Sequence, residues 1–424
     1  MPSDEPEPFR LPLHDRVDEG ERRAALPLAP PKVTIPLAPP QPAEEASPDP
    51  QPGLEPTPAP LPTPAPEREL RQFPTDELLK HVVGLGCSDL HLAAGHPPHV
   101  RLAGRLEPVE GHDVLGPDDV RRCLGHLLEA EHWQCIDRGE TLDVVRPVAG
   151  LARFRVNAYP TSQGLAAVLH LIPWKVPALT TLGLPAVVTQ IAQLPAGLVL
   201  VGGSTGSGRS TTLASLFDAA RTSRAGHAMT IESSVEFVLT DGPGLVSQRE
   251  VGPDAAARVA ALREANRQDV DIVLVDDLDD LDVLTEALAA AASGRLVLGA
   301  VRSQTAAAAI ERVILGSPKE RRPWVRAELA ASLRAVIAQV LCRRADGSGL
   351  VVATELLRMT PELVAIVRDG DLAHVPAAIG QGSELRMQTM DDALAGLVDR
   401  GEVTLEEAAR HSPDPDVLNR RPGP

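Results

Sequence analysis

The feature that most constrains this chain is a glycine-rich stretch between a predicted buried strand and a predicted helix. The strand covers 198–201, and the helix continues through Phe217. Between them, the pattern Gly-x-x-x-x-Gly-Arg-Ser matches the phosphate-binding P-loop (Walker A), except that Arg209 stands at the lysine position. Glycines let backbone N–H groups turn towards a phosphate, and the helix start adds a favourable dipole. We therefore expect nucleotide phosphates to be bound by Gly203, Ser204, Thr205, Gly206, Ser207, Gly208, Arg209, Ser210 and Thr211.

Composition narrows the class of protein. A net charge of −17 argues against a nucleic-acid-binding surface, because phosphate contacts along a nucleic acid need clustered Lys and Arg. Four scattered cysteines without a Cys-x-x-Cys pair argue against a disulfide framework and fit a reducing cytoplasm. No apolar run approaches the roughly 18 residues of a membrane span. No lysine lies between Lys175 and Lys319, so no neighbour in sequence replaces the missing lysine.

The first part of the chain divides into a tail and a small domain. Residues 1–70 contain 20 of the 41 prolines and lack the apolar density of a core, so we expect a disordered Pro-rich tail. Residues 71–173 combine alternating strand patterns with amphipathic helix patterns, including one helix over 117–131. This combination predicts a compact α+β domain.

Beyond Pro173 the pattern changes to an alternation of strands and helices. The strand patterns cover 198–201, 227–231, 271–275 and 295–301. Such an alternation predicts a mostly parallel sheet within an α/β domain over 180–345, with ligands at the carboxyl ends of the strands. For the remainder we expect a helical C-terminal region over 346–412 and a disordered tail over 413–424.

Several short motifs follow one another along the chain from Phe73 to His411. They are Ser88-Asp-Leu-His-Leu92, Ala152-Arg-Phe-Arg-Val-Asn157, the Thr-Gly-Ser-Gly loop, Thr230-Ile-Glu232, Glu236-Phe237, Gln248-Arg-Glu250, Asp271-Ile-Val-Leu-Val275, Glu311-Arg-Val313 and Met387-Gln-Thr-Met-Asp391. In this order they resemble the ATPases of type IV pilus retraction and type II secretion, and in particular the PilT-like motors of the GspE superfamily. The resemblance implies a RecA-like P-loop domain preceded by a PAS-like α+β domain.

The resemblance also implies cofactors, partners and a location. The cofactors are ATP and Mg²⁺. Six copies form a ring, either of this chain alone or with related ATPases, which pulls on an inner-membrane platform protein of a pilus or secretion system. The implied location is the cytoplasm, with a peripheral position at the inner membrane.

The resemblance assigns site residues one by one. The catalytic candidates are Glu232, Glu236 and Asp277. The candidates for holding Mg²⁺ are Ser210 and Asp276, and the further cations are Arg153, Arg155 and Arg302.

Several of these positions depart from the family pattern. Arg209 replaces lysine, Asp276-Asp277 replaces Gly-Glu, and Arg302 replaces a histidine. Arginine is bulkier than lysine and cannot take quite the same position. Asp277 is one methylene shorter than glutamate, which disturbs the geometry of an attacking water. The remaining departures are Ser233 and Ser234 for Asp and Pro, and Gln163 and His170 for two arginines.

Together these departures predict weak or lost ATP hydrolysis on a retained scaffold. The first interpretation is therefore a regulatory or structural paralogue that binds ATP, a pseudo-ATPase of twitching motility or secretion. The alternative is a slow but functional hexameric retraction motor that uses Arg209 and Asp277. A third interpretation is an adaptor whose working part is the Pro-rich tail.

Overall fold

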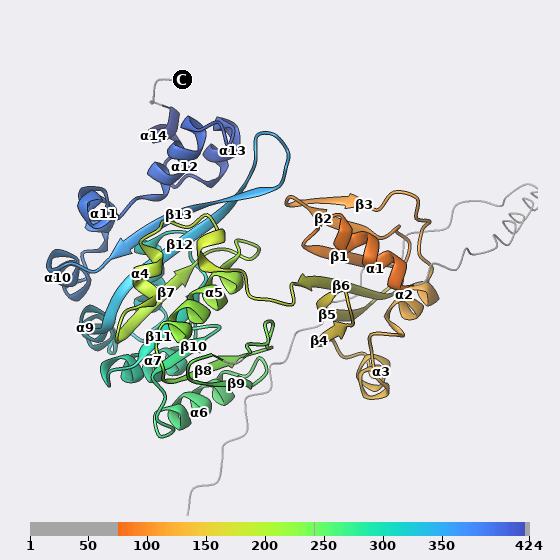
Figure 1. The fold of residues 1–424 in the computed structure, drawn as a ribbon, viewed down its shortest axis with the longest axis horizontal. Coiled ribbons are helices and arrows are strands. Elements are labelled where there is room, and N and C mark those ends of the chain that lie inside the picture. Colours follow the sequence, from red (N-terminus) through yellow and green to blue (C-terminus); the bar gives the residue numbers. More distant parts are fainter. Residues whose placement is uncertain (1–74, 241, 420–424) are drawn as a thin grey trace, which may run out of the picture. The chain divides into compact units, whose positions relative to one another are not determined.

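The computed structural model describes residues 75–240 and 242–419, which form two β-sheets with their helices (Figure 1). These residues belong to the second of the two units into which the chain divides, Leu70–Pro424. The predicted disordered tail over 1–70 lies outside the described residues. Within the described ranges, no helix is long and apolar enough to cross a membrane.

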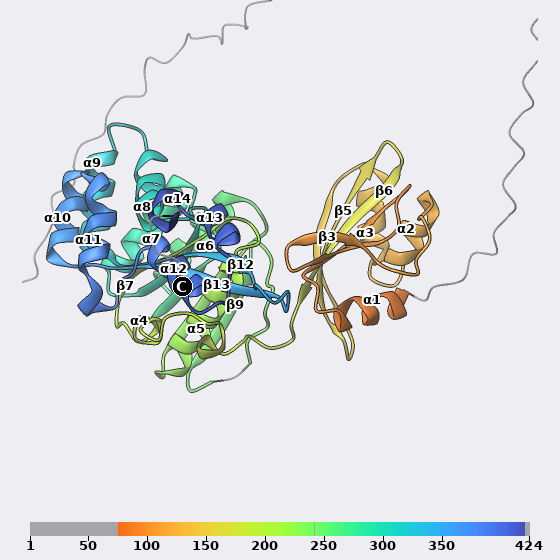
Figure 2. The ribbon, with the colours of Figure 1, turned by 90° about the horizontal axis from the view of Figure 1, so that it is seen from above.

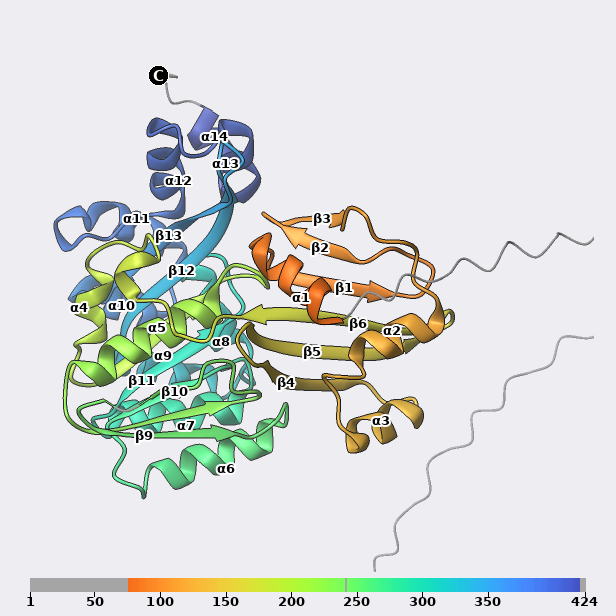
Figure 3. The ribbon, with the colours of Figure 1, turned by 45° about the vertical axis from the view of Figure 1, so that its right-hand side comes forward.

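The first sheet has six antiparallel strands in the order β3-β2-β1-β6-β5-β4. They are β1 (Asp89–Ala93), β2 (His99–Leu102), β3 (Arg105–Pro108), β4 (Leu142–Val148), β5 (Ala152–Thr161) and β6 (Gly164–Ile172). Alternate residues of a strand share a face, and Leu90, Phe154 and Val156 are buried on one face of this sheet. Figure 3 shows the helices α1 (Thr75–Gly84), α2 (Pro117–Leu124) and α3 (Ala130–Asp137) beside this sheet. Their apolar side chains belong to the same core. The predicted α+β character is confirmed.

The single helix predicted over 117–131 is wrong, because α2 ends at Leu124 and α3 begins at Ala130. Gly125 follows α2, and glycine costs about 1 kcal/mol in a helix interior relative to alanine. At the start of α3, the backbone N–H of Glu129 is 3.0 Å from Nδ1 of His132, an acceptor that caps the new helix. Leu127 and Leu128 are buried in the intervening turn. Their apolar spacing therefore reflects the core rather than one continuous helix.

The second sheet has seven strands in the order β13-β12-β7-β11-β10-β8-β9, and only its β12–β13 pair is antiparallel. The strands are β7 (Gly197–Gly202), β8 (His227–Glu232), β9 (Leu245–Glu250), β10 (Ile272–Val275), β11 (Leu296–Val301), β12 (Leu333–Arg343) and β13 (Leu350–Arg358). The prediction of a mostly parallel sheet is confirmed, and the order puts β7 in its interior, between β12 and β11.

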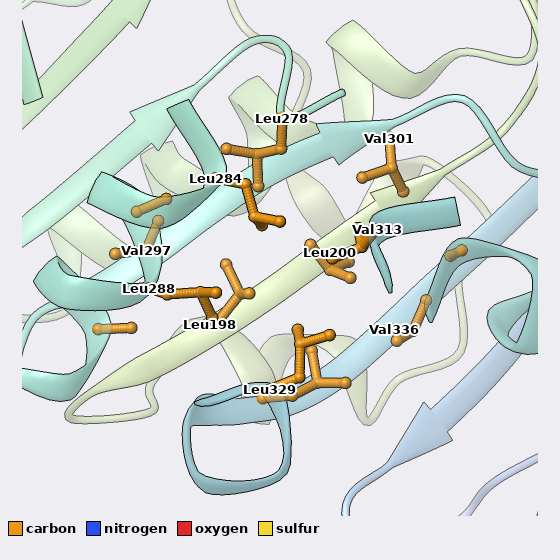
Figure 4. Close-up of a cluster of buried hydrophobic side chains, with 14 of the residues drawn as sticks. Leu198, Leu200, Leu278, Leu284, Leu288, Val297, Val301, Val313, Leu329 and Val336 are labelled. Atoms are coloured by element: carbon orange, nitrogen blue, oxygen red, sulfur yellow. The ribbon is translucent and has the colours of Figure 1, made fainter. Parts of the chain in front are cut away.

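Helices cover both faces of this sheet, so its central strands are apolar on both sides. Val199 and Val201 of β7 pack with α4 (Val188–Ala192) and α5 (Arg209–Thr222). Leu198 and Leu200 point to the opposite face, where Leu284, Leu288, Val313 and Leu329 meet them (Figure 4). Those four side chains come from α7 (Leu281–Ala292), α8 (Ala306–Leu315) and α9 (Arg322–Ser332), and α6 (Ala255–Ala265) packs on the same face. This burial holds the carboxyl ends of β7, β8, β10 and β11 at one edge.

The helical region predicted over 346–412 is wrong in its first part, because it begins with β13. This strand pairs with β12 from Arg343↔Leu350 onward. The intervening turn has φ values of 75° at Gly347 and 136° at Gly349, which favour glycine. The sequence Asp-Gly-Ser-Gly before a β-branched run is itself a hairpin signal.

From Pro361 onward the chain is helical, as predicted. The helices are α10 (Pro361–Asp369), α11 (Val375–Gln381), α12 (Met390–Asp399) and α13 (Leu405–His411). Helices α9, α10 and α11 lie side by side (Figure 2). The predicted disordered tail over 413–424 is wrong for α14 (Pro415–Asn419), and 420–424 lies outside the described residues.

Candidate functional site

The glycine-rich stretch forms a tight loop between β7 and α5, here called the phosphate loop (residues 203–211). A Cβ on Gly203 would lie 2.1 Å from Oγ of Ser207, so only glycine fits there. Gly208, the residue before α5, has φ +84°, which also favours glycine. The Ser207 N–H donates to the Ser204 carbonyl at 3.2 Å. The loop therefore has the sharp turn into a helix N-terminus that the motif predicts.

A neighbouring strand supports this loop from beneath. Nε2 of Gln339 on β12 donates to the Ser207 carbonyl at 2.6 Å, and Gln339 is 1% exposed. A Cβ on Gly203 would also lie 2.9 Å from the Gln339 carbonyl. Backbone and β12 together therefore fix the shape of the loop. Sequence reasoning missed Gln339. The only signal for it was its polarity within an otherwise apolar run over 335–342.

Arg209, at the lysine position of the motif, extends across to the next strand. Its Nη1 donates to the Val301 carbonyl at the end of β11, at 2.9 Å. Burial, followed by the positive charge of Arg302, lowers the pKa of Arg209 below its usual value. One of its five N–H donors is thus committed to the protein, while Nε and Nη2 have other donors to offer.

Asp276, at the end of β10, is at the centre of a group of hydrogen bonds. Its Oδ1 accepts from Nε of Arg258 on α6 at 3.0 Å. Its Oδ2 accepts from the backbone N–H of Ser233 at 2.6 Å and from the Ser233 hydroxyl at 2.5 Å. Arg258, 7% exposed, also donates from Nη2 to the same hydroxyl. The ends of β8 and β10 are therefore tied together by a buried cation.

The next acids along the chain are paired with two more arginines. Nη2 of Arg302 donates to Oδ2 of Asp277 at 3.0 Å, and the Asp279 N–H donates to Oδ1 of Asp277 at 2.9 Å. Asp279 accepts from Nε of Arg312 at 2.7 Å and from its Nη2 at 3.0 Å, and Nε of Arg302 lies 3.5 Å from it. We call Asp276, Asp277 and Asp279 with Arg258, Arg302 and Arg312 the arginine-paired edge.

Sequence reasoning missed Arg258 and Arg312, although a signal existed for the first. Arg258 occupies a buried position of α6, beside Val259 and Leu262. An arginine at a core-facing helix position needs a carboxylate nearby. Asp280, by contrast, caps α7 by accepting from the Asp282 and Val283 N–H groups, as expected for acids at a helix start.

One cavity of about 190 Å³ is lined by the last part of the phosphate loop, Arg209 and Ser210, and by part of the arginine-paired edge, Asp276, Asp277 and Arg302. The predicted phosphate-binding residues 203–208 and Thr211 are not in its lining. The predicted site residues on its wall are Arg155, Arg209, Ser210, Glu232, Glu236, Asp276, Asp277 and Arg302. Burial and the neighbouring carboxylates Asp276, Glu236 and Glu250 raise the pKa of Glu232 to about 7. Among the described residues the structure thus brings together acidic and basic candidates from the ends of β8, β10 and β11, from β5 and from α5.

The two arginines of β5 reach the loop that follows β8. Nη2 of Arg153 donates to the Val235 carbonyl at 3.1 Å, and its Nη1 donates to the Glu236 carbonyl. Arg155 pairs with Asp143 at 2.8 Å and lies 3.4 Å from Oε1 of Glu236. Arg155 lines the cavity, whereas Arg153 holds the backbone behind it.

Comparison with known proteins gives the context of this arrangement. Residues 142–351 match the family described as "Type II/IV secretion system protein". The type IV pilus retraction ATPase PilT of Pseudomonas aeruginosa is 38% identical over 340 residues, which are 80% of this chain and 98% of that protein. This chain is a member of the PilT-like family of pilus and secretion ATPases.

Further relatives support the assignment of this chain to the PilT-like family. The type IV pilus ATPase PilU of the same organism is 31% identical over 337 residues, covering 80% of this chain and 88% of PilU. A solved structure of the pilus retraction motor PilT with bound ADP aligns with a TM-score of 0.69 at 35% identity, covering 81% of this chain and 98% of that one. The α/β fold class predicted from the motifs of this PilT-like chain is therefore confirmed.

Proposed function

We propose that this chain is a nucleotide-binding subunit of a type IV pilus or secretion motor in which ATP hydrolysis is weak or lost. It acts as a regulatory or structural partner of a related ATPase. The observation that carries the proposal is the contrast within one cavity: the phosphate loop keeps its shape, while the cation and the carboxylate needed for transfer are held in bonds within the protein. The ADP bound by the related PilT supports a nucleotide as the ligand.

The cation of the loop is poorly placed for phosphoryl transfer. A P-loop lysine stabilises the transferred phosphoryl group as a compact charge, and catalysis of this kind depends on position and electrostatics. Arg209 instead donates to the Val301 carbonyl, so its guanidinium is anchored towards β11. It can contact a phosphate through its remaining donors, which favours binding more than transfer.

The candidate water-positioning carboxylate is also constrained. Asp277 accepts from Arg302 and from the Asp279 N–H, so each of its oxygens already has a partner. To orient an attacking water it must break or share the Arg302 ion pair. Misplacement of a single group by about 1 Å can cost on the order of a hundredfold in rate.

We further propose that the chain assembles into a ring, alone or with related ATPases, and works in the cytoplasm on an inner-membrane platform protein. The relatives named for pilus retraction support this setting. In a mixed ring, a subunit that holds nucleotide without splitting it would change the rate of its neighbours. Co-purification of the tagged chain with an active PilT-like motor, followed by ATPase measurement of the mixed ring, tests this part.

One pair of measurements on the full chain tests the proposed function. Nucleotide binding is followed by calorimetric titration, and phosphate release is followed on the same preparation. We expect saturable binding with turnover at least a hundredfold below that of an active motor. Turnover at motor-like rates would reject the proposed function. Absence of binding would reject both the proposed function and the slow-motor alternative.

A further inference from the structure

We infer that the cavity binds a nucleoside polyphosphate as a metal-free anion, with arginine guanidiniums supplying the positive charge that Mg²⁺ would otherwise supply. The inference rests on the proposed function, because it assumes that a nucleotide enters this cavity. It follows from comparing the hydrogen-bond acceptors that a metal would need with the donors that a phosphate would need. The carboxylate oxygens that a metal would need are already occupied, whereas arginine donors for a phosphate remain.

Asp276, the carboxylate predicted to hold Mg²⁺, does not fit that role. Its Oδ2 accepts two hydrogen bonds from Ser233, and an oxygen of a carboxylate has about two lone-pair sites. Its Oδ1 accepts from Arg258, whose other nitrogens donate to the Ser233 hydroxyl and to the Pro253 carbonyl. A magnesium ion at Asp276 would therefore lie against a buried guanidinium and would have to displace it.

The other two acids of the arginine-paired edge are in the same condition. Asp277 faces Arg302, and Asp279 faces both Arg302 and Arg312. Mg²⁺ demands near-octahedral oxygen ligands at about 2.0–2.1 Å and gives up its waters reluctantly. Guanidiniums held within 3.0 Å of Asp276 and Asp277 compete with it both for space and by charge repulsion. The hydroxyl of Ser210 remains the one predicted magnesium ligand without such a competitor among the described contacts.

Donors for a phosphate, by contrast, remain at the cavity. Arg302 uses Nη2 and Nε on Asp277 and Asp279, which leaves the two N–H groups of Nη1. Arg209 uses Nη1 and keeps Nε and Nη2. The Arg302 side chain is 61% exposed, so it can turn towards a ligand without unfolding the edge. Arginine binds phosphate through planar, paired hydrogen bonds, which supply the charge neutralisation that a metal otherwise gives.

Calorimetric titration of the full chain with ATP and with ADP tests the inference, once with excess MgCl₂ and once with EDTA at matched ionic strength. We expect the dissociation constants in the two buffers to agree within about threefold. Binding that weakens by more than about tenfold in EDTA would overturn metal-free binding while leaving the proposed function intact. Absence of binding in both buffers would reject the proposed function, and the inference would fall with it.

Arg302→Gln identifies the cation responsible, and Arg321→Gln is the matched control. The first substitution removes a guanidinium from the cavity and frees Asp277, so we expect binding in EDTA to weaken about tenfold or more and Mg²⁺ to restore part of it. Arg321 is exposed and does not line the cavity, so its substitution should change neither constant. Unchanged binding of Arg302→Gln in EDTA would contradict the inference. Arg302→Lys keeps the charge but loses the planar donors, so its affinity in EDTA should lie between those of Arg302→Gln and the unmodified chain.

Discussion

The phosphate loop and the arginine-paired edge each contribute residues to the same cavity, but the two are held in different ways. The loop is shaped by backbone contacts and by Gln339 beneath it, so replacing lysine with Arg209 leaves its geometry in place. The edge consists of side chains, and each of its carboxylates faces a guanidinium. A site for holding a phosphate can therefore survive changes that remove the free carboxylates needed to split it.

Breaking the buried Arg258–Asp276 pair of the arginine-paired edge should have the largest effect on stability. Arg258→Met removes the cation and leaves Asp276 unpaired in a partly buried site, so we expect the free energy of unfolding to fall by about 3 kcal/mol. Urea unfolding of the full chain measures this loss. The double variant Arg258→Met, Asp276→Gly, which removes both charges, should recover most of it. A loss below about 1 kcal/mol in the single variant would mean that this pair does not hold the edge together.

A side chain added at Gly203 should distort the backbone of the phosphate loop and weaken nucleotide binding. Gly203→Ala puts a methyl group 2.1 Å from Oγ of Ser207 and 2.9 Å from the Gln339 carbonyl, so the loop must open. We expect nucleotide binding to weaken by about thirtyfold or more, because misplaced amides lose their phosphate contacts. Gly380→Ala is the control: it lies within α11 with nothing within 4 Å of the new methyl group, and it should keep full binding. Equal affinity for the two variants would refute the importance of the loop geometry.

Glu232, which lines the cavity between the two regions, should make the stability of the protein depend on pH. Its pKa is raised to about 7 by burial and by neighbouring carboxylates, whereas the unfolded side chain releases its proton near pH 4.5. Between these values the folded protein binds more protons, so the free energy of unfolding falls as the pH rises. The stability of Glu232→Gln relative to the unmodified chain should therefore increase by about 2 kcal/mol from pH 4.5 to pH 6.5. Denaturant unfolding of both proteins at each pH measures the difference, and a constant difference would contradict the raised pKa.

Much of the fold and part of the site could be predicted from the sequence. The strand before Gly203 and the helix after it were accessible because motif spacing reports local geometry. The cavity residues Glu232, Asp277 and Arg302 were accessible through the resemblance to the PilT-like ATPases. The β12–β13 hairpin was missed because the turn signal around Gly347 was overlooked in a segment interpreted as helical.

The pairing within the edge could not be predicted, and the reason is physical. Arg258 and Asp276 are 18 residues apart, and Arg302 and Asp277 are 25 apart, so their contact depends on strand order and helix packing. The direction of Arg209 depends in the same way on the Val301 carbonyl of a strand far along the chain. Spacing indicates which residues reach one edge of a sheet, but which donor meets which acceptor there is decided by tertiary structure.

The exposed half of the edge should give the smallest effect. Arg312 is 48% exposed and pairs with Asp279, which also lies 3.5 Å from Arg302 and so keeps a cation when Arg312 is removed. Solvent screens such a pair, and we expect Arg312→Gln to lower the free energy of unfolding by about 0.5 kcal/mol. Urea unfolding beside Arg258→Met gives the comparison directly. A cost near that of Arg258→Met would mean that the edge acts as one cooperative network. A small cost would locate its stability in the buried Arg258–Asp276 pair and leave Arg302, which lines the cavity, available for a ligand.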